Sequence, residues 1–252
     1  YAGSQIQKNG ITIQEHLDKA LRSLFAGAKV KTIFAGRTDS GVHALRQTVS
    51  ALVDRQIQPD KVLKALNSLL PPDIRVNEAR YVKPEFNPRY DAANREYLYN
   101  IYYGRAPLLY LQDKVWYIDA RRKLNRQLMR RAARLLRGEH DFAAFCAAGS
   151  VVKNKVRRVT VSEITARRVY RWPGAKNKVD GLLLTYRIQA DGFLYHMVRN
   201  IVAALVEVGL KKMTPRDLRE IMRSGQRSKL RTATAPAAGL VLSDVKYDRE
   251  KL

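Results

Sequence analysis

A ten-residue loop, Ala35 to Ala44, separates two apolar stretches that are typical of β-strands. These stretches run from Val30 to Ala35 and from Gln47 to Val53. The loop has two glycines and several small polar residues, a composition that predicts a tight, exposed connection. Loops held on rigid strands are where catalytic groups concentrate. This one carries the guanidinium of Arg37 and the carboxylate of Asp39, although capping of a turn is a simpler role for such an aspartate.

The chain is strongly basic. Its 252 residues include 47 Lys and Arg against 23 Asp and Glu, which gives a formal net charge of +24. An excess of this size is typical of proteins that bind a polyanion, most commonly nucleic acid. No stretch approaches the length of a membrane-spanning helix and no basic amphipathic segment stands apart, so a membrane partner is disfavoured.

The cysteines, histidines and motifs exclude several classes of chemistry. Cys146 is the single cysteine, and the four histidines show no metal-ligand spacing, so neither an intramolecular disulfide nor a metal site is expected. There is no Walker loop, dinucleotide-binding fingerprint, zinc-deaminase signature or nucleophile elbow. The sequence therefore gives no support for nucleotide hydrolysis, redox chemistry or metal-assisted deamination. With no visible signal peptide, we expect a cytoplasmic protein.

Hydrophobic periodicity predicts alternating helices and strands. Helices are predicted over 12–25, 59–70, 124–137, 194–208 and from 215 to 222. Strands are predicted over 30–35, 47–53, 74–82, 95–103, 156–169, 182–190 and 240–247. A basic loop through Lys176 and Lys178 joins the two strands at 156–169 and 182–190. Hairpin-like strand pairs outnumber strict βαβ units, which favours an α+β fold with mixed or antiparallel sheets. A boundary near 92–94 would give two α+β units, 1–93 and 94–252.

Three residues are candidates for chemistry. Asp39 could act as a nucleophile or base if a cation keeps it ionised in a partly dry site. Arg199 lies in an otherwise apolar helix, where an arginine is costly unless it is paired, although it could also extend to the surface from the first turn. Tyr97 lies on an alternating strand, where a tyrosine usually packs in the core; in a cleft it could stack on a base or move a proton.

Clusters of basic residues are candidates for phosphate contacts. One cluster lies on the polar face of the helix predicted at 124–137: Arg126, Arg130, Arg134 and Arg137. Another lies at and just before the start of the strand predicted over 156–169: Lys153, Lys155, Arg157 and Arg158. Each residue alone could be an ordinary solvated charge, whereas together they account for much of the basic character.

Four segments, in order along nearly the whole chain, resemble the tRNA pseudouridine synthase A family. The loop at 35–44 is similar to that family's Ala-Gly-Arg-Thr-Asp-x-Gly-Val-His-Ala segment, and 95–99 is similar to its Arg-x-Tyr-x-Tyr strand. The segment at 196–201 is similar to its His-Met-Val-Arg-Asn helix start, and 233–240 to its Ala-Pro-x-x-Gly-Leu segment. Two departures are visible: the family's first strand has no counterpart before Tyr1, and Ser4 stands where many relatives carry an aromatic residue.

The resemblance implies the pseudouridine synthase fold, in which two α+β units surround a central basic cleft. It implies a cofactor-free, homodimeric enzyme that isomerises uridine to pseudouridine at positions 38 to 40 of the tRNA anticodon stem-loop. Asp39 would be the essential carboxylate, by attack at C1′, by attack at C6, or by deprotonating the sugar to give a glycal. Arg199 would pair with Asp39 and hold it ionised, and Tyr97 would pack on the uracil and accept the C5 proton.

The remaining site residues follow from the same resemblance. Arg37, beside Thr38, would hold the target nucleotide out of the stem, and Leu240 would form part of the pocket wall. Two other functions stay open. A non-catalytic RNA-binding protein could keep this fold and its basic surface. A base-excising glycosidase would usually need two carboxylates flanking the sugar, of which the loop supplies one.

Overall fold

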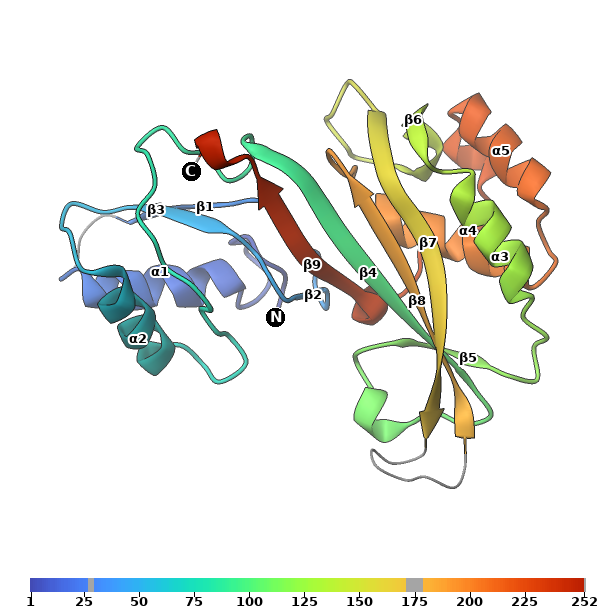
Figure 1. Cartoon of the computed structure of the whole chain (residues 1–252), viewed down its shortest axis with the longest axis horizontal. Coiled ribbons are helices and arrows are strands. Elements are labelled where there is room, and N and C mark those ends of the chain that lie inside the picture. Colours follow the sequence, from blue (N-terminus) through green and yellow to red (C-terminus); the bar gives the residue numbers. More distant parts are fainter. Residues whose placement is uncertain (27–29, 171–178, 252) are drawn as a thin grey trace. The chain divides into compact units, whose positions relative to one another are not determined.

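A computed structural model describes residues 1–26, 30–170 and 179–251. Contacts divide the chain into two compact units. Unit 1 contains Tyr1–Val42, Arg46–Ala93 and Val245–Leu252, and unit 2 contains His43–Leu45 and Asn94–Asp244. Each unit combines helices with strands, so the α+β class predicted from the sequence is confirmed (Figure 1). The predicted basic loop through Lys176 and Lys178 lies outside the described residues.

Unit 1 is built on a short sheet and two helices. Strand β1 (Lys31–Phe34) pairs antiparallel with β3 (Val49–Leu52). Helix α1 (Ile13–Leu24) begins at a capping box in which Thr12 and Glu15 satisfy each other's backbone N–H groups, as the sequence pattern predicts. Helix α2 (Pro59–Leu69) starts with proline in its first turn and ends just before Pro71-Pro72. The apolar core of this unit consists of Ala20, Leu21, Phe25, Leu66 and Leu70.

The strand predicted over 74–82 is wrong, because the structure has no strand there. Ile74 and Val76 still pack against the unit 1 core, which accounts for the alternating apolar pattern. The backbone of Val76 is bonded by a side chain instead of by a neighbouring strand. Its N–H donates to Oδ1 of Asn67 at 2.9 Å, and its carbonyl accepts from Nδ2 of Asn67 at 2.8 Å. The side chain of Asn67 on α2 thus supplies the two backbone hydrogen bonds that a neighbouring strand would have made with Val76.

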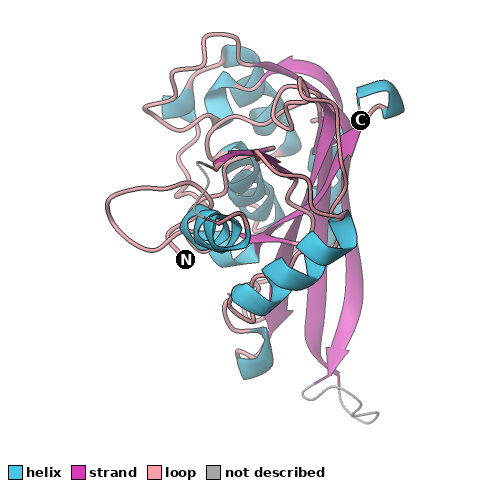
Figure 2. Ribbon diagram, turned by 90° about the vertical axis from the view of Figure 1, so that its left-hand side faces the viewer, coloured by secondary structure: helices cyan, strands magenta, loops and turns pink. Residues whose placement is uncertain are grey.

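Unit 2 contains a larger mixed sheet. In the described part of the chain it has seven strands, six in the order β2-β9-β4-β8-β7-β6, and β5 pairs with the C-terminal end of β4 outside this order. The long strands β4 (Ala92–Gly104), β7 (Val156–Tyr170) and β8 (Val179–Ala190) pair antiparallel (Figures 1 and 2). Two short strands add parallel pairs: β2 (His43–Ala44) on β9 (Leu240–Tyr247), and β5 (Trp116–Asp119) on β4. Strand β6 (Gly138–Asp141) closes the other edge.

Three helices cover one face of this sheet (Figure 1). They are α3 (Arg126–Arg134), α4 (Met197–Gly209) and α5 (Pro215–Ser224). Helix α3 is shorter than the predicted 124–137, because Asn125 caps its start and the chain leaves the helix at Leu135. The covered face is apolar, with side chains of β4 and β8 that are at most 2% exposed: Tyr99, Ile101, Leu184, Tyr186 and Ile188. Burial of such side chains is the main stabilising term for this layer.

Candidate active site

The loop that carries Asp39 is hydrogen-bonded to the N-terminal segment of unit 1. Oγ of Ser4 accepts the N–H of Thr38 at 2.9 Å, and the N–H of Ser4 donates to the Thr38 carbonyl at 3.1 Å. Ser4 itself is only 3% exposed. Gly3 adopts φ +95°, and a Cβ there would lie 2.7 Å from the Thr38 carbonyl oxygen. Ser4 therefore bonds both backbone groups of the residue before Asp39, and sequence reasoning did not assign Ser4 or Gly3 to the site.

A turn and a cross-loop bond complete the geometry of this loop. The N–H of Val42 donates to the Asp39 carbonyl at 3.1 Å, closing a turn in which Gly41 has φ +76°. Only glycine adopts such a dihedral without strain, so Gly41 is needed for the turn. At the base of the loop, Nε2 of Gln47 donates to the carbonyl of Gly36 at 2.8 Å. Asp39 thus lies on a short, rigid connection after β1, as predicted, and Arg37 is exposed beside it.

After Val42 the chain enters the sheet of unit 2. His43 and Ala44 form β2, in register with Val241 and Leu242 of β9, and the N–H of Leu45 donates to the Leu242 carbonyl at 2.9 Å. A ring nitrogen of His43 bonds the Asp113 carbonyl at 2.6 Å. The His43 side chain therefore joins β2 to the loop that contains Asp113 in unit 2.

In unit 2, Arg199 lies in the first turn of α4. Its Nε donates to the carbonyl of Ala235 at 2.7 Å, which fixes the guanidinium on the segment 233–240. His196, directly before the helix, adopts a left-handed conformation with φ +57°, and its ring lies 3.9 Å from that of Tyr195. A histidine in this conformation stores local backbone strain, a feature that clusters at functional sites. The helix start is thus both strained and tightly bonded.

Asn200 also joins the start of α4 to the segment 233–240, and sequence reasoning did not identify this residue. It is fully buried, its Nδ2 donates to the Phe145 carbonyl at 2.8 Å, and its Oδ1 accepts from Oγ1 of Thr234 at 2.9 Å. Residues 34 positions apart in the sequence are therefore joined at a single amide. A buried amide that is bonded through both its nitrogen and its oxygen specifies one arrangement of its neighbours. The signal available in the sequence was a second polar residue, next to Arg199, in the apolar start of this helix.

The tyrosines of β4 lie close to this cluster. Tyr97 is 7% exposed and packs edge-to-face on Phe193, with 5.0 Å between ring centroids. The hydroxyl of Tyr99 donates to the Pro236 carbonyl at 2.8 Å. Burial raises the pKa of the Tyr99 phenol, and the positive charge of Arg199 opposes that shift. Tyr97 and Leu240 therefore lie on neighbouring strands of unit 2, and Arg199 lies close enough to Tyr99, two residues along β4 from Tyr97, to influence its pKa.

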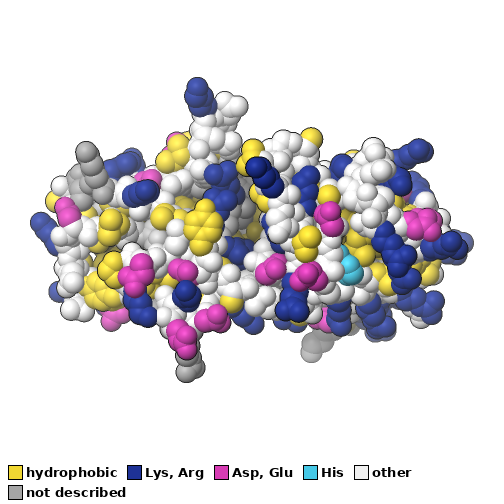
Figure 3. Space-filling model, turned by 90° about the horizontal axis from the view of Figure 1, so that it is seen from above, with side chains coloured by type: hydrophobic (Ala, Val, Ile, Leu, Met, Phe, Trp, Pro, Cys, Tyr) yellow, Lys and Arg dark blue, Asp and Glu magenta, His cyan; other side chains and the backbone are white. Residues whose placement is uncertain are grey.

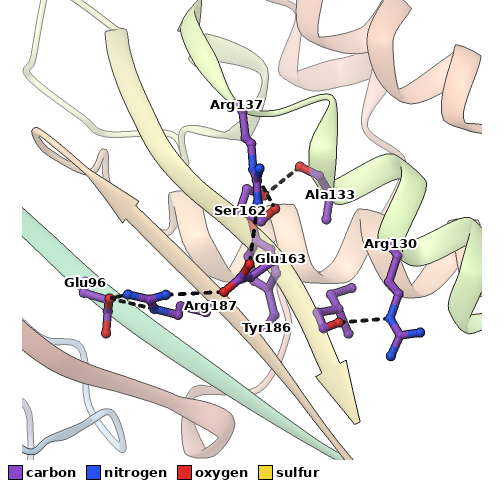
Figure 4. Close-up of polar contacts among 9 residues, drawn as sticks. Glu96, Arg130, Ala133, Arg137, Ser162, Glu163, Tyr186 and Arg187 are labelled. Carbon is purple, nitrogen blue, oxygen red and sulfur yellow. Dashed lines mark hydrogen bonds and ion pairs between the residues drawn. The ribbon is translucent and has the colours of Figure 1, made fainter.

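A charged network on the sheet face opposite the three helices joins β4, β8 and β7 next to Tyr97 (Figure 4). Glu96 accepts two bonds from Arg187, at 2.8 Å from Nε and 2.7 Å from Nη2, and this raises the pKa of the Arg187 guanidinium. Arg187 also contacts Glu163 on β7 at 3.3 Å, and Glu163 contacts Arg137 at 3.6 Å. Oγ of Ser243 donates to Glu96 at 2.9 Å. Both Arg187 nitrogens bind the same oxygen, Oε2 of Glu96, and an ion pair at such a half-exposed site contributes little to stability.

The predicted phosphate-binding residues of the segment 153–158 lie in unit 2, at and just before the start of β7. Lys153 and Arg158 are exposed, and Lys155 and Arg157 are half-buried. Nη1 of Arg157 donates to the Asn154 carbonyl at 3.0 Å, so part of this guanidinium bonds its own loop. Figure 3 shows further Lys and Arg side chains over the unit 2 helices. Among the described residues, no group of three His, Cys, Asp or Glu side chains could hold a metal ion.

Comparison with known proteins places the chain in a family. A family model described as tRNA pseudouridine synthase matches residues 2–91 and 132–248, which include both the Asp39 loop and the Arg199 helix. The chain belongs to the tRNA pseudouridine synthase family. It is 38% identical to a protein named tRNA pseudouridine synthase A from Acetivibrio thermocellus, and 39% identical to proteins of that name from Moorella thermoacetica and Geobacter sulfurreducens. Each comparison covers 98% of this chain and 94% of the relative. The resemblance seen in the four segments is confirmed.

None of the helices in the described part of the chain has both the length and the apolar composition that a bilayer crossing requires.

Proposed function

We propose that this chain converts uridine to pseudouridine at positions 38 to 40 of the tRNA anticodon stem-loop. The observation that carries the proposal is the family match over 2–91 and 132–248, together with relatives named tRNA pseudouridine synthase A that are aligned over almost their full length. The basic surface fits an RNA substrate, since a net charge of +24 favours a polyanionic partner. The assignment to the anticodon stem-loop rests on the likeness to the A family.

The reaction rearranges bonds without a net redox change. The N1–C1′ bond of uridine breaks, the uracil turns, and C5 bonds to C1′. A proton leaves C5, and N1 ends with a proton. The enzyme therefore has to stabilise a separated base and sugar and to move protons, and these tasks suit a carboxylate, a cation and a phenol. This balance needs no oxidant or reductant, in keeping with the proposal that no cofactor takes part.

We assign Asp39 as the essential carboxylate and Arg199 as the cation that keeps it ionised. Two features of the fold support this pairing of roles. The Asp39 loop is held rigidly by Ser4 and Gly41, so the carboxylate is pre-organised. Three residues separate Asp39 from His43, so the loop leads directly into strand β2, which pairs with β9 in unit 2.

The other site residues act on the substrate. Tyr97 would pack on the uracil and accept the C5 proton, and Leu240 would form an apolar wall of the pocket. Arg37, exposed beside Thr38, would hold the target nucleotide out of the stem. Flipping a stacked base costs a few kcal/mol. Phosphate contacts offset that cost in RNA enzymes, and we assign such contacts to the following residues: Lys153, Lys155, Arg157 and Arg158.

We further propose that the protein works in the cytoplasm as a homodimer, with one tRNA touching both subunits. The homodimer follows from the likeness to the A family. The cytoplasmic location follows from the tRNA substrate and from the single cysteine, which is buried and free.

Tritium release tests the catalytic assignment. Unmodified tRNA labelled with tritium at uracil C5 loses the label to water only when C5–C1′ bond formation expels the C5 proton. We expect release with the wild type and none with Asp39→Ala or with Asp39→Asn, which keeps the shape of the side chain. Release by the Asn variant at the wild-type rate would remove Asp39 from the mechanism.

The same experiment distinguishes the proposed enzyme from a non-catalytic RNA-binding protein. Such a protein would bind the tRNA with similar affinity in wild-type and Asp39→Asn forms but would release no tritium in either. A glycosidase would free uracil from the tRNA, which chromatography of the products detects.

A further inference from the structure

A basic hollow lies at the start of α3 in unit 2, and its lining includes none of the residues assigned above to the reaction. Its volume is about 560 Å³. Four of its lining residues are cations, Lys123, Arg126, Arg130 and Lys211, and none of the lining residues is acidic. We call it the α3 hollow. An ordinary solvated face mixes charges of both signs, so a concave site of one sign needs another explanation.

The charges on α3 oppose the electrostatics of a helix. The first turn of α3 contains no acidic residue and begins with Arg126, although a helix N-terminus favours negative charge. Arg126 and Arg130 are four residues apart, as are Arg130 and Arg134, and like charges at this spacing destabilise a helix. A bound anion at the N-terminus would reverse both effects, because it complements the helix dipole and neutralises the arginines.

Arg130 is already oriented for an anion. Its Nε donates to the carbonyl of Ile164 on β7 at 3.0 Å, and its two terminal nitrogens point away from that strand (Figure 4). A guanidinium fixed in this way loses little side-chain entropy when it binds a second partner. The planar pair of N–H groups that remains matches the geometry of phosphate oxygens.

The backbone around the hollow is fixed as well. The hydroxyl of Tyr103 donates to the Ala120 carbonyl at 3.0 Å. The N–H of Asn125 donates to the carbonyl of Gly209 at 2.7 Å, and its side chain caps α3 at Leu128. Lys211 adopts φ +61° just after α4, at a position where glycine would be the unstrained choice. A lysine in this strained position is what one expects where the charge itself is required.

We propose that the α3 hollow binds backbone phosphates of the tRNA. This inference rests on tRNA being the substrate, and it adds a contact that shares no residue with the segment 153–158. Phosphate contacts position an RNA without reading its sequence. The hollow would therefore contribute affinity and orientation for the tRNA body, and it would take no part in bond breaking.

The test is the salt dependence of tRNA binding by matched variants. The hollow variant is Lys123→Gln with Arg126→Gln, two exposed residues for which the structure gives no side-chain hydrogen bond. The control is Arg219→Gln with Arg223→Gln on the exposed face of α5, which removes the same charge outside the hollow. Dissociation constants for unmodified tRNA are measured by filter binding between 50 and 200 mM salt, after thermal unfolding has verified that each variant is folded.

The hollow variant is expected to lose two phosphate contacts. Each contact contributes about 0.7 to 0.9 to the slope of log K against log salt, so the slope should fall by about 1.5 and the affinity at 0.1 M salt by roughly thirtyfold. The control should match the wild type. Equal slopes for the hollow variant and the control would overturn the proposal, whether both change or neither does. Pseudouridine formation by the wild type in the same tRNA stock reports the proposed function separately.

Discussion

Gly3 gives the sharpest test of how the Asp39 loop is held. Its φ of +95° is a conformation that L side chains rarely adopt, and a Cβ there would lie 2.7 Å from the Thr38 carbonyl oxygen. Ordinary contact begins near 3.4 Å, so Gly3→Ala moves the Thr38 carbonyl by about 0.7 Å or moves the N-terminal segment by as much. Either movement strains the two bonds between Ser4 and Thr38, and it shifts Asp39, the next residue.

The magnitude follows from the displacement. A misplacement of about 1 Å costs about 100-fold in rate, so a shift of about 0.7 Å should lower kcat by roughly 10- to 30-fold. The backbone strain adds about 1–3 kcal/mol of destabilisation. Gly149→Ala is the matched control, because Gly149 has φ +83° and its Cβ would meet nothing within 4 Å. The control shares the strain and lacks the collision, so its kcat should stay near the wild-type value.

Single-turnover tritium release measures the chemical step for both variants, and thermal unfolding measures their stability. If Gly3→Ala keeps the kcat of Gly149→Ala, the contacts of Gly3 and Ser4 with Thr38 have no part in positioning Asp39. The structural argument for a pre-organised carboxylate would then be wrong.

Three further predictions follow from the described contacts. Asn200→Ala leaves the Phe145 carbonyl without its bond, so urea unfolding should show a loss of about 3 kcal/mol, against less than about 1 kcal/mol for Asn154→Ala on the exposed loop. Bonds from the Thr214 backbone and side chain hold the pKa of Asp217 below its usual value, so its contribution to stability is present above about pH 4 and is lost as the pH falls through the lower folded-state pKa. Asp217→Asn should therefore melt below the wild type at pH 7, with the gap closing in acid; a constant gap would contradict this. The last prediction concerns the four cations of the segment 153–158, which are Lys153, Lys155, Arg157 and Arg158. Replacing all four with glutamine should lower the salt slope of tRNA binding by up to about 3, and an unchanged slope would show that these residues do not touch RNA.

Elements with strong local signals were predictable from the sequence. Helix α1 follows from the capping pair Thr12 and Glu15 and an apolar stripe, and α2 follows from a proline at its start and two prolines after its end. The long antiparallel strands follow from alternation over many residues. In these cases the local preference and the tertiary environment agree, which is typical of natural sequences.

The misses share one physical cause, which is that a side chain from elsewhere in the sequence supplies the deciding bond. Ile74 and Val76 alternate like a strand, but the side chain of Asn67 satisfies the Val76 backbone. The role of Asn200 depends on Thr234 and Phe145, and the role of Ser4 depends on Thr38. No local pattern reveals such partners. Asp39 and Arg199 were selected from the sequence because each was chemically unusual for its surroundings.

The central claim is that the Asp39 loop serves the conversion of uridine to pseudouridine in the anticodon stem-loop. Base-resolution mapping of pseudouridine in unmodified tRNA, after incubation with wild-type and Asp39→Asn protein, tests it directly. The account predicts new pseudouridine at positions 38 to 40 with the wild type and none with the variant. Pseudouridine at other positions, or equal conversion by the two proteins, would contradict it.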